Sequence, residues 1–225
     1  MQWAPRRGLL QRAANEQLTG PKELGKDRRR LVRPSLSEGN MSIILTKGQR
    51  VDVQLRKVHI GLGWDPNASA SSFEYDLDAS AFMLDARRKV PSDRCFVFYN
   101  NQVSDDGAVS SSGDDRSGGN SEGDDETLTV ELPRVRSDVQ EIVFVVTIHE
   151  AAERRQNFGQ VRNAFIRVVD ADSNKEMFKY ELDEDFSACT AVEFGRLYRR
   201  GDGWRFEALG QGSRRDLTAI LTQFR

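Results

Sequence analysis

The stretch VEFGRLYRRGDGWRFEAL (residues 192–209) is the clearest indication of the fold. Apolar and polar residues alternate along much of 192–198 and 204–209, and this alternation is typical of half-buried β-strands. Gly201, Asp202 and Gly203 separate the two runs, and such residues tolerate the backbone angles of a tight turn. We therefore predict an antiparallel hairpin here.

The same strand pattern recurs through most of the chain. Val51, Val53 and Leu55 alternate with polar residues. Similar short runs lie at residues 59–64, 78–84, 95–99, 127–132, 141–149, 165–169 and 176–182. About ten short strands separated by turn residues predict a mainly β fold, an antiparallel β-sandwich of two sheets.

Helical patterns are sparse and peripheral. Residues 150–156 (EAAERRQ) predict a short surface helix. A second helix is predicted near the C-terminus, where Ser213 and Asp216 resemble a capping box. An apolar stripe with helical spacing follows: Leu217, Ile220, Leu221 and Phe224. We expect this stripe to pack onto the sandwich, with docking to a partner as the alternative.

The charge of the chain is unevenly distributed. The 225 residues are 38% hydrophobic and 30% charged, with a net charge of −2, which allows one large core. Residues 1–40 carry nine Lys or Arg against four acids, and they show no sustained apolar period. We predict a disordered basic extension over 1–40, unless Met41 is the true start, and a β-sandwich domain over 41–225.

Cysteine usage and hydropathy indicate the compartment. Cys95 and Cys189 lie far apart without CxxC spacing, so neither a disulfide framework nor a four-cysteine zinc site is indicated. No apolar run approaches the roughly 18 residues of a membrane-spanning helix, and residues 1–40 lack the apolar region expected of a secretory signal. We expect a cytoplasmic protein without a transmembrane segment. Nucleic acid is not expected as a partner, except through the basic extension and its Arg28–Arg30 cluster.

An acidic segment between Ser104 and Glu126 stands out. Its eight acids face one arginine, and it is rich in glycine and serine, so a long loop is predicted. The acids are Asp105, Asp106, Asp114, Asp115, Glu122, Asp124, Asp125 and Glu126. Crowded carboxylates repel by about 1 kcal/mol per close pair in water. A bound cation would relieve this repulsion, whereas a solvated loop without metal is the alternative.

Calcium is the first candidate cation and magnesium the second. Calcium takes six to eight oxygen ligands, whereas magnesium keeps more of its waters. Asp76 and Asp78 are two residues apart in an extended segment, so their side chains are expected on one face. The spacing does not match an EF-hand loop, so any site must combine loops distant in sequence.

Catalysis finds little support in the sequence. His59 and His149 lie in strand patterns, where packed or edge histidines are common. No GxSxG, HExxH or Walker motif is present. The alternative to a binding protein is a metal-dependent phosphoesterase or other hydrolase built on the acidic cluster, with Arg154 and Arg155 as a substrate clamp.

Several long motifs closely resemble the TerD family of tellurium-resistance and general stress proteins. The resemblance covers Met41 to about Phe224. The motifs are GLGWD (61–65), DLDASAF (76–82), FYNNQVSDDGAV (98–109), GDD (113–115), GDDE (123–126), VVTIHEAAERRQNFGQVRNAFIRV (145–168) and LYRRGDGWRFEALGQG (197–212).

The resemblance implies a calcium-binding, non-enzymatic, bacterial stress-response protein that contributes to tellurite and chemical-stress resistance. It implies other ter-type stress proteins as partners, including a membrane-associated component. By motif it places the ligands of Ca²⁺, taken as two ions, on Asp76, Asp78, Asp114, Asp115, Asp124, Asp125 and Glu126, with backbone carbonyls from Gly118 and Gly123.

Overall fold

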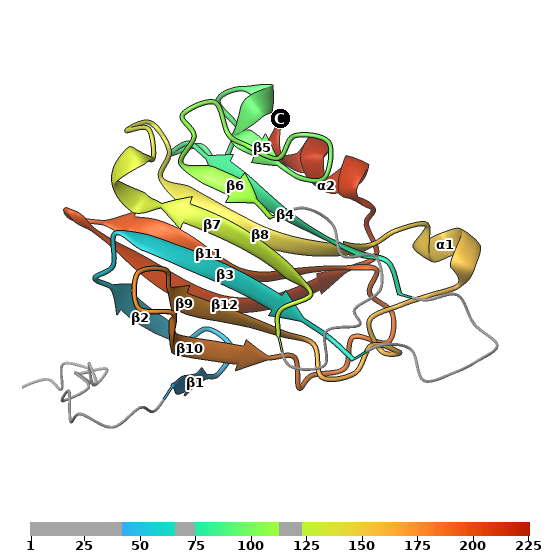
Figure 1. Ribbon diagram of the computed structural model, residues 1–225. Helices are drawn as coiled ribbons and strands as arrows, with labels where there is room; N and C mark the ends of the chain where they lie inside the picture. Colours follow the sequence, from blue (N-terminus) through green and yellow to red (C-terminus); the bar gives the residue numbers. More distant parts are fainter. Residues whose placement is uncertain (1–41, 66–74, 113–122) are drawn as a thin grey trace, which may run out of the picture. The chain divides into compact units, whose positions relative to one another are not determined.

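Two six-stranded sheets form the fold of this protein in a computed structural model that describes residues 42–65, 75–112 and 123–225 (Figure 1). In sheet order, the first contains β1 (Ile43–Leu45), β10 (Lys175–Glu181), β9 (Phe165–Asp170), β3 (Lys57–Gly63), β7 (Glu126–Glu131) and β6 (Val109–Ser111). The second contains β2 (Arg50–Val53), β12 (Gly203–Ser213), β11 (Ala191–Arg200), β8 (Glu141–Ile148), β4 (Leu77–Leu84) and β5 (Phe96–Val97). The predicted sandwich of two sheets is confirmed.

Strand pairing is mostly antiparallel. The β11–β12 hairpin pairs Arg200 with Gly203 across a two-residue turn, and Gly201 there has a φ of 57°. A positive φ suits the tight turns that match strand twist, so the predicted hairpin is confirmed. The exception to the antiparallel pattern is β1, which pairs in parallel with β10, Ile43 opposite Phe178.

The main core lies between the two sheets. Alternate residues of β3 point inward and are fully buried, as Val58 and Ile60 show. From the second sheet, Phe144 and Val146 of β8 belong to the same core. Alternation along each strand therefore decides which side chains face the opposite sheet.

A second apolar cluster covers the outer face of the second sheet. Helix α2 (Leu217–Phe224) buries Ile220 and Phe224 against Phe82 and Val143. Every residue of β4 and β8 is consequently buried, because core covers one face of these strands and α2 lies on the other (Figure 1). The expected packing of the apolar stripe is confirmed.

Both helices begin differently from the prediction. The N-cap of α2 is Asp216, whose carboxylate accepts a hydrogen bond from the Ala219 N–H at 2.7 Å. Ser213 is the last residue of β12, so the predicted start at Ser213 is wrong. Helix α1 spans Ala151–Arg154 only, because left-handed residues flank it on both sides. Two single 3₁₀ turns lie at Asp93–Cys95 and Leu132–Arg134.

The acidic segment between Ser104 and Glu126 is not one long loop. Strand β6 lies within it, with Val109 fully buried opposite Val130 of β7. Glu126 is the first residue of β7. The prediction of an uninterrupted loop is therefore wrong, because edge pairing with β7 brings a polar segment into the sheet.

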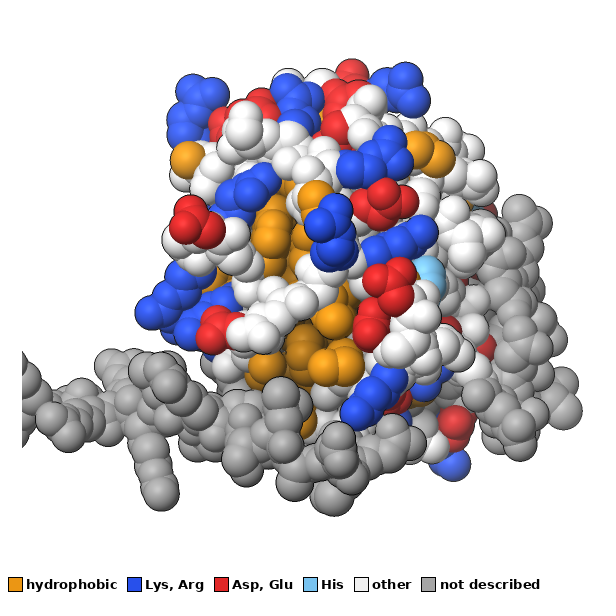
Figure 2. All heavy atoms as spheres, turned by 60° about the vertical axis from the view of Figure 1, so that its left-hand side comes forward, with side chains coloured by type: hydrophobic (Ala, Val, Ile, Leu, Met, Phe, Trp, Pro, Cys, Tyr) orange, Lys and Arg blue, Asp and Glu red, His pale blue; other side chains and the backbone are white. Residues whose placement is uncertain are grey.

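Charges of both signs are mixed over the face drawn in Figure 2. Lysine and arginine side chains stand beside aspartate and glutamate side chains there, around a central area of hydrophobic side chains. Ion pairs on the described surface include Lys47–Glu184 at 2.6 Å and Lys57–Glu131 at 3.5 Å. None of the helices in the described part of the chain is long and apolar enough to cross a membrane.

Candidate metal centre

Four strand ends meet at one end of the sandwich. Leu62 of β3 pairs with Glu126 of β7, and Leu77 of β4 pairs with Ile148 of β8. The backbone N–H of Ala79 in β4 donates a hydrogen bond to Glu126 Oε2 at 2.6 Å and so joins the two sheets. We call this region the acidic end; its described acids are Asp76, Asp78, Asp124, Asp125 and Glu126.

Asp125 and Glu126 are both only 6% exposed and bind backbone N–H groups. Glu126 reaches Ala79 because β5 pairs with β4 at Ala81 and Phe82 and leaves the preceding edge of β4 open to a side-chain acceptor. Asp125 Oδ2 accepts a hydrogen bond from the Trp64 N–H at 2.7 Å. Charge-assisted hydrogen bonds of this kind hold both carboxylates in place.

Asp124 forms a two-bond ion pair on the outer face of the first sheet. Arg167 of β9 donates from Nε to Asp124 Oδ1 at 2.7 Å and from Nη2 to Oδ2 at 3.2 Å. The carboxylate lies directly over Gly61, where a Cβ would be 2.1 Å from Asp124 Oδ2. Burial raises the pKa of the Asp124 carboxyl even though the Arg167 guanidinium opposes that shift. Because the Asp124 carboxylate lies so close to the Gly61 backbone, any side chain at position 61 would clash with it, and glycine is required there.

Asp76 and Asp78 have different neighbours. Asp78 is a β4 residue, 9% exposed, with Oδ2 3.8 Å from His149 Nδ1. Asp76 precedes the strand, and its Oδ2 lies 3.4 Å from Arg154 Nη1 of α1. His149 follows the end of β8 and is substantially exposed, so its predicted place within a strand is wrong. His59 does lie in β3, with Nδ1 2.9 Å from the Thr129 hydroxyl.

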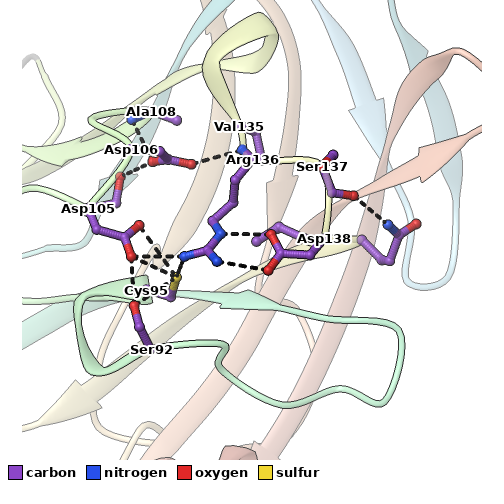
Figure 3. Close-up of polar contacts among 12 residues, drawn as sticks. Ser92, Cys95, Asp105, Asp106, Ala108, Val135, Arg136, Ser137 and Asp138 are labelled. Carbon is purple, nitrogen blue, oxygen red and sulfur yellow. Dashed lines mark hydrogen bonds and ion pairs between the residues drawn. The ribbon is translucent and has the colours of Figure 1, made fainter.

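Two acids of the 104–126 segment belong to a separate polar cluster (Figure 3). Asp106 accepts hydrogen bonds from the Ser104 hydroxyl at 2.7 Å and from the backbone N–H groups of Ala108 and Arg136, each at 2.9 Å. Asp105 pairs with Arg136 Nη1 at 2.9 Å. Both carboxylates therefore have partners within the protein itself: hydrogen bonds for Asp106 and an ion pair for Asp105.

The acidic end supplies part of a calcium donor set. Asp78, Asp125 and Glu126 offer the hard carboxylate oxygens that calcium prefers. Within residues 42–65, 75–112 and 123–225, however, no three His, Cys, Asp or Glu side chains come together as a metal cluster. Gly123 is described and exposed, whereas Asp114, Asp115 and Gly118 lie outside the described residues. Six to eight ligands would therefore require donors beyond the described carboxylates.

The groups that hold these acids were not predicted from the sequence. Arg167 was assigned only to a strand, although its polar position between apolar neighbours marks it as facing outward. The Trp64 and Ala79 N–H groups carry no sequence signal at all, because every residue except proline has one.

Comparison with known proteins identifies the relatives of this chain. The family model described as TerD domain matches residues 41–224. Tellurium resistance protein TerD of Serratia marcescens is 47% identical over 189 residues, covering 82% of this chain and 97% of that protein. General stress protein 16U of Bacillus subtilis (strain 168) is 46% identical, with the same coverage of both chains.

A solved structure shares the fold. The crystal structure of a homologue of telluride resistance protein (TerD) from Streptomyces coelicolor superposes with a TM-score of 0.62 and 23% sequence identity. The match covers 74% of this chain and 95% of that one. The family match over most of the chain, with the 47% and 46% identity to the two relatives, shows that the chain belongs to the TerD family.

Proposed function

We propose that this protein is a calcium-binding, non-enzymatic stress-response protein of the bacterial cytoplasm that contributes to tellurite and other chemical-stress resistance. In this proposal calcium, taken as two ions, orders the acidic end into a surface for a protein partner. The contact of Glu126 with the Ala79 N–H supports it most directly, since that contact brings the GDDE and DLD motifs together from the two sheets.

The chemistry of the described carboxylates favours calcium over magnesium. Asp125 and Glu126 lie together at the start of β7, and the Glu126 carboxylate touches the peptide group between Asp78 and Ala79. Calcium accepts several protein carboxylates in irregular geometry, whereas magnesium demands an octahedron and keeps its waters. Asp114 and Asp115, with carbonyls from Gly118 and Gly123, are proposed as the further ligands.

Relatives suggest the biological setting. Their names are tellurium resistance protein and general stress protein, and we extend both roles to this chain as part of the proposal. We propose other ter-type stress proteins as partners, with a membrane-associated component among them. A soluble adaptor that presents a calcium-dependent surface would fit such an assembly.

A metal-dependent hydrolase is the less favoured candidate. Arg154, considered as a substrate clamp, lies 3.4 Å from Asp76 and 3.0 Å from Glu150. A guanidinium already paired with carboxylates is poorly available to a substrate phosphate, so the geometry favours binding over hydrolysis.

Calcium should raise the melting temperature of the full chain after chelator treatment. Binding to the folded state alone stabilises by about 2.7 kcal/mol when free calcium is 100 times Kd. We expect Asp78→Asn and Glu126→Gln to reduce the shift strongly, because each removes a proposed ligand charge. Glu131→Gln, at the far end of the same strand β7, is the matched control and should retain it. The measurement is differential scanning calorimetry with calcium or chelator.

Three results would count against the proposal. A parent melting curve that calcium leaves unchanged contradicts calcium binding. Phosphoester turnover with calcium, magnesium or manganese that Glu126→Gln abolishes contradicts the non-enzymatic role. Equal capture of purified ter-type partners in calcium and in chelator contradicts a calcium-ordered partner surface.

A further inference from the structure

Asp124 and Glu126 lie on opposite faces of the first sheet. Glu126 is buried and reaches Ala79 in the second sheet, so it faces inward. Asp124 binds Arg167, whose neighbours Ile166 and Val168 are core residues, so Arg167 and its partner face outward. Simple strand alternation would place residues 124 and 126 on the same face. The chain therefore breaks alternation just before β7 begins.

The outward position of Asp124 depends on Arg167 and Gly61. Arg167 makes two hydrogen bonds to the Asp124 carboxylate and a third, at 3.1 Å, to Glu176 of β10. Gly61 leaves the space that the carboxylate fills. A planar guanidinium that binds both carboxylate oxygens fixes orientation as well as charge. This contact links β7 to β9 across β3.

We propose that Asp124 is an anchor rather than a calcium ligand. Clamped by Arg167 over Gly61, it fixes the start of β7 so that Asp125 and Glu126 are presented at the acidic end. Asp124 and Arg167 are thus positioning residues for calcium binding. This inference rests on the proposed function and reassigns one acid of the GDDE motif away from the metal.

The proposal separates two kinds of variant. An anchor residue contributes to the structure with or without calcium, since its ion pair is part of the fold. A ligand acts through the metal, and in chelator its removal relieves repulsion among neighbouring carboxylates. Removing the Arg167 charge distinguishes the two roles of Asp124. If Asp124 is an anchor, losing Arg167 weakens calcium binding. If Asp124 is a calcium ligand, losing Arg167 removes a competing cation and strengthens calcium binding.

The test uses the full chain with Asp124→Asn, Arg167→Gln, the double variant, and Glu126→Gln as the ligand reference. Isothermal titration calorimetry measures how many calcium ions bind and how tightly. We expect Asp124→Asn and Arg167→Gln to keep the ion number of the parent and to weaken affinity about tenfold, the lower range for loss of a group that orients metal ligands. Glu126→Gln should lose an ion.

Urea unfolding in chelator forms the second arm. Arg167→Gln should lower the midpoint, because it leaves the Asp124 carboxylate without its cation. The double variant should differ from the sum of the two single variants, because the partners are in contact. Arg167→Lys keeps the charge but not the two-bond geometry, and it replaces Arg167→Gln if that variant does not fold. Lys179→Gln, on the neighbouring strand, is the control and should leave calcium binding unchanged.

Loss of one bound ion in Asp124→Asn, together with tighter calcium binding in Arg167→Gln, would overturn the proposal. So would strictly additive effects in chelator. If the parent binds no calcium, the proposed function fails, and the chelator arm still decides whether Asp124 and Arg167 form an anchor.

Discussion

Glu207 and Glu193 are buried glutamates on the outer face of the second sheet with different partners. Glu207 pairs with Arg50 at 2.8 Å and with Arg196 at 2.7 Å. Glu193 lies 3.6 Å from Arg215. Burial alone would raise the pKa of Glu207, because it disfavours the charged carboxylate. Hydrogen bonds from Arg50 and Arg196 favour that charged form and hold the pKa below its usual value. For Glu193, burial dominates and raises the pKa. Partner geometry thus decides whether a buried charge stabilises the fold.

Glu207→Gln should destabilise the protein at neutral pH and much less in acid. A lowered folded-state pKa means that the carboxylate stabilises the fold above the usual value of 4.5, and that this contribution is lost as pH falls through the folded-state pKa. We expect a loss on the order of 1–3 kcal/mol at neutral pH, because two arginines lose a charged partner. Urea unfolding from about pH 7 to about pH 3 measures it.

Glu193→Gln is the matched control. Its raised pKa means that the charged form costs stability once the pH exceeds the usual value of 4.5, so the neutral glutamine should leave the fold as stable or more stable at neutral pH. That difference should vanish in acid, where Glu193 is protonated in both states. Equal destabilisation by the two substitutions at neutral pH would contradict this account.

At the scale of elements, helix α2 shows how packing completes a local signal. Its eight residues are too few for a stable isolated helix, so its stability comes from the sheet beneath it. The Phe224 ring lies 5.0 Å from the Phe82 ring, which stacks on Phe96. The aromatic contacts therefore hold the helix on the outer face of β4 and β5.

Phe224→Ala should destabilise the protein by about 3 kcal/mol, because it removes a buried ring between the helix and the sheet. Thr222→Ala, on the exposed side of the same helix, should change stability by less than about 0.5 kcal/mol. Urea unfolding of both variants at neutral pH checks this. Similar losses would mean that helix propensity, rather than packing, determines the stability of α2.

At the scale of the whole molecule, the strands and both apolar clusters lie in one compact unit. That unit spans Asn40–Arg225, and the family match begins at residue 41. Residues 1–40 were predicted as a basic extension outside the domain, and this boundary stays a prediction. Leu45 of β1, by contrast, is a core residue only a few positions later.

A chain that begins at Met41 should unfold at the same urea concentration as the full chain. All described core residues are retained in it. A chain that begins at Lys47 should be less stable, because it lacks β1 and the buried Leu45 side chain, a loss of roughly 2–5 kcal/mol. Circular dichroism with urea titration compares the three. A large loss on removing residues 1–40 alone would place the domain boundary earlier.

Local patterns alone predicted most strands, the β11–β12 hairpin and the apolar stripe of α2. Alternation, turn chemistry and helical spacing are properties of contiguous residues, so they can be read without knowing what lies across the core. Strand β6 was not predicted in this way. Its three residues, Val109–Ser111, become a strand by pairing with β7.

Tertiary structure alone decided how the acids are used. The sequence determined that carboxylates cluster in the 104–126 segment and the DLD motif, and it made calcium the first candidate ion, which the family resemblance also implied. Asp124, however, meets Arg167 from 43 residues away, and Glu126 meets the N–H of Ala79 from 47 residues away. These partners meet because the order of the strands in the sheets brings residues distant in sequence together, and that order cannot be predicted from local sequence patterns.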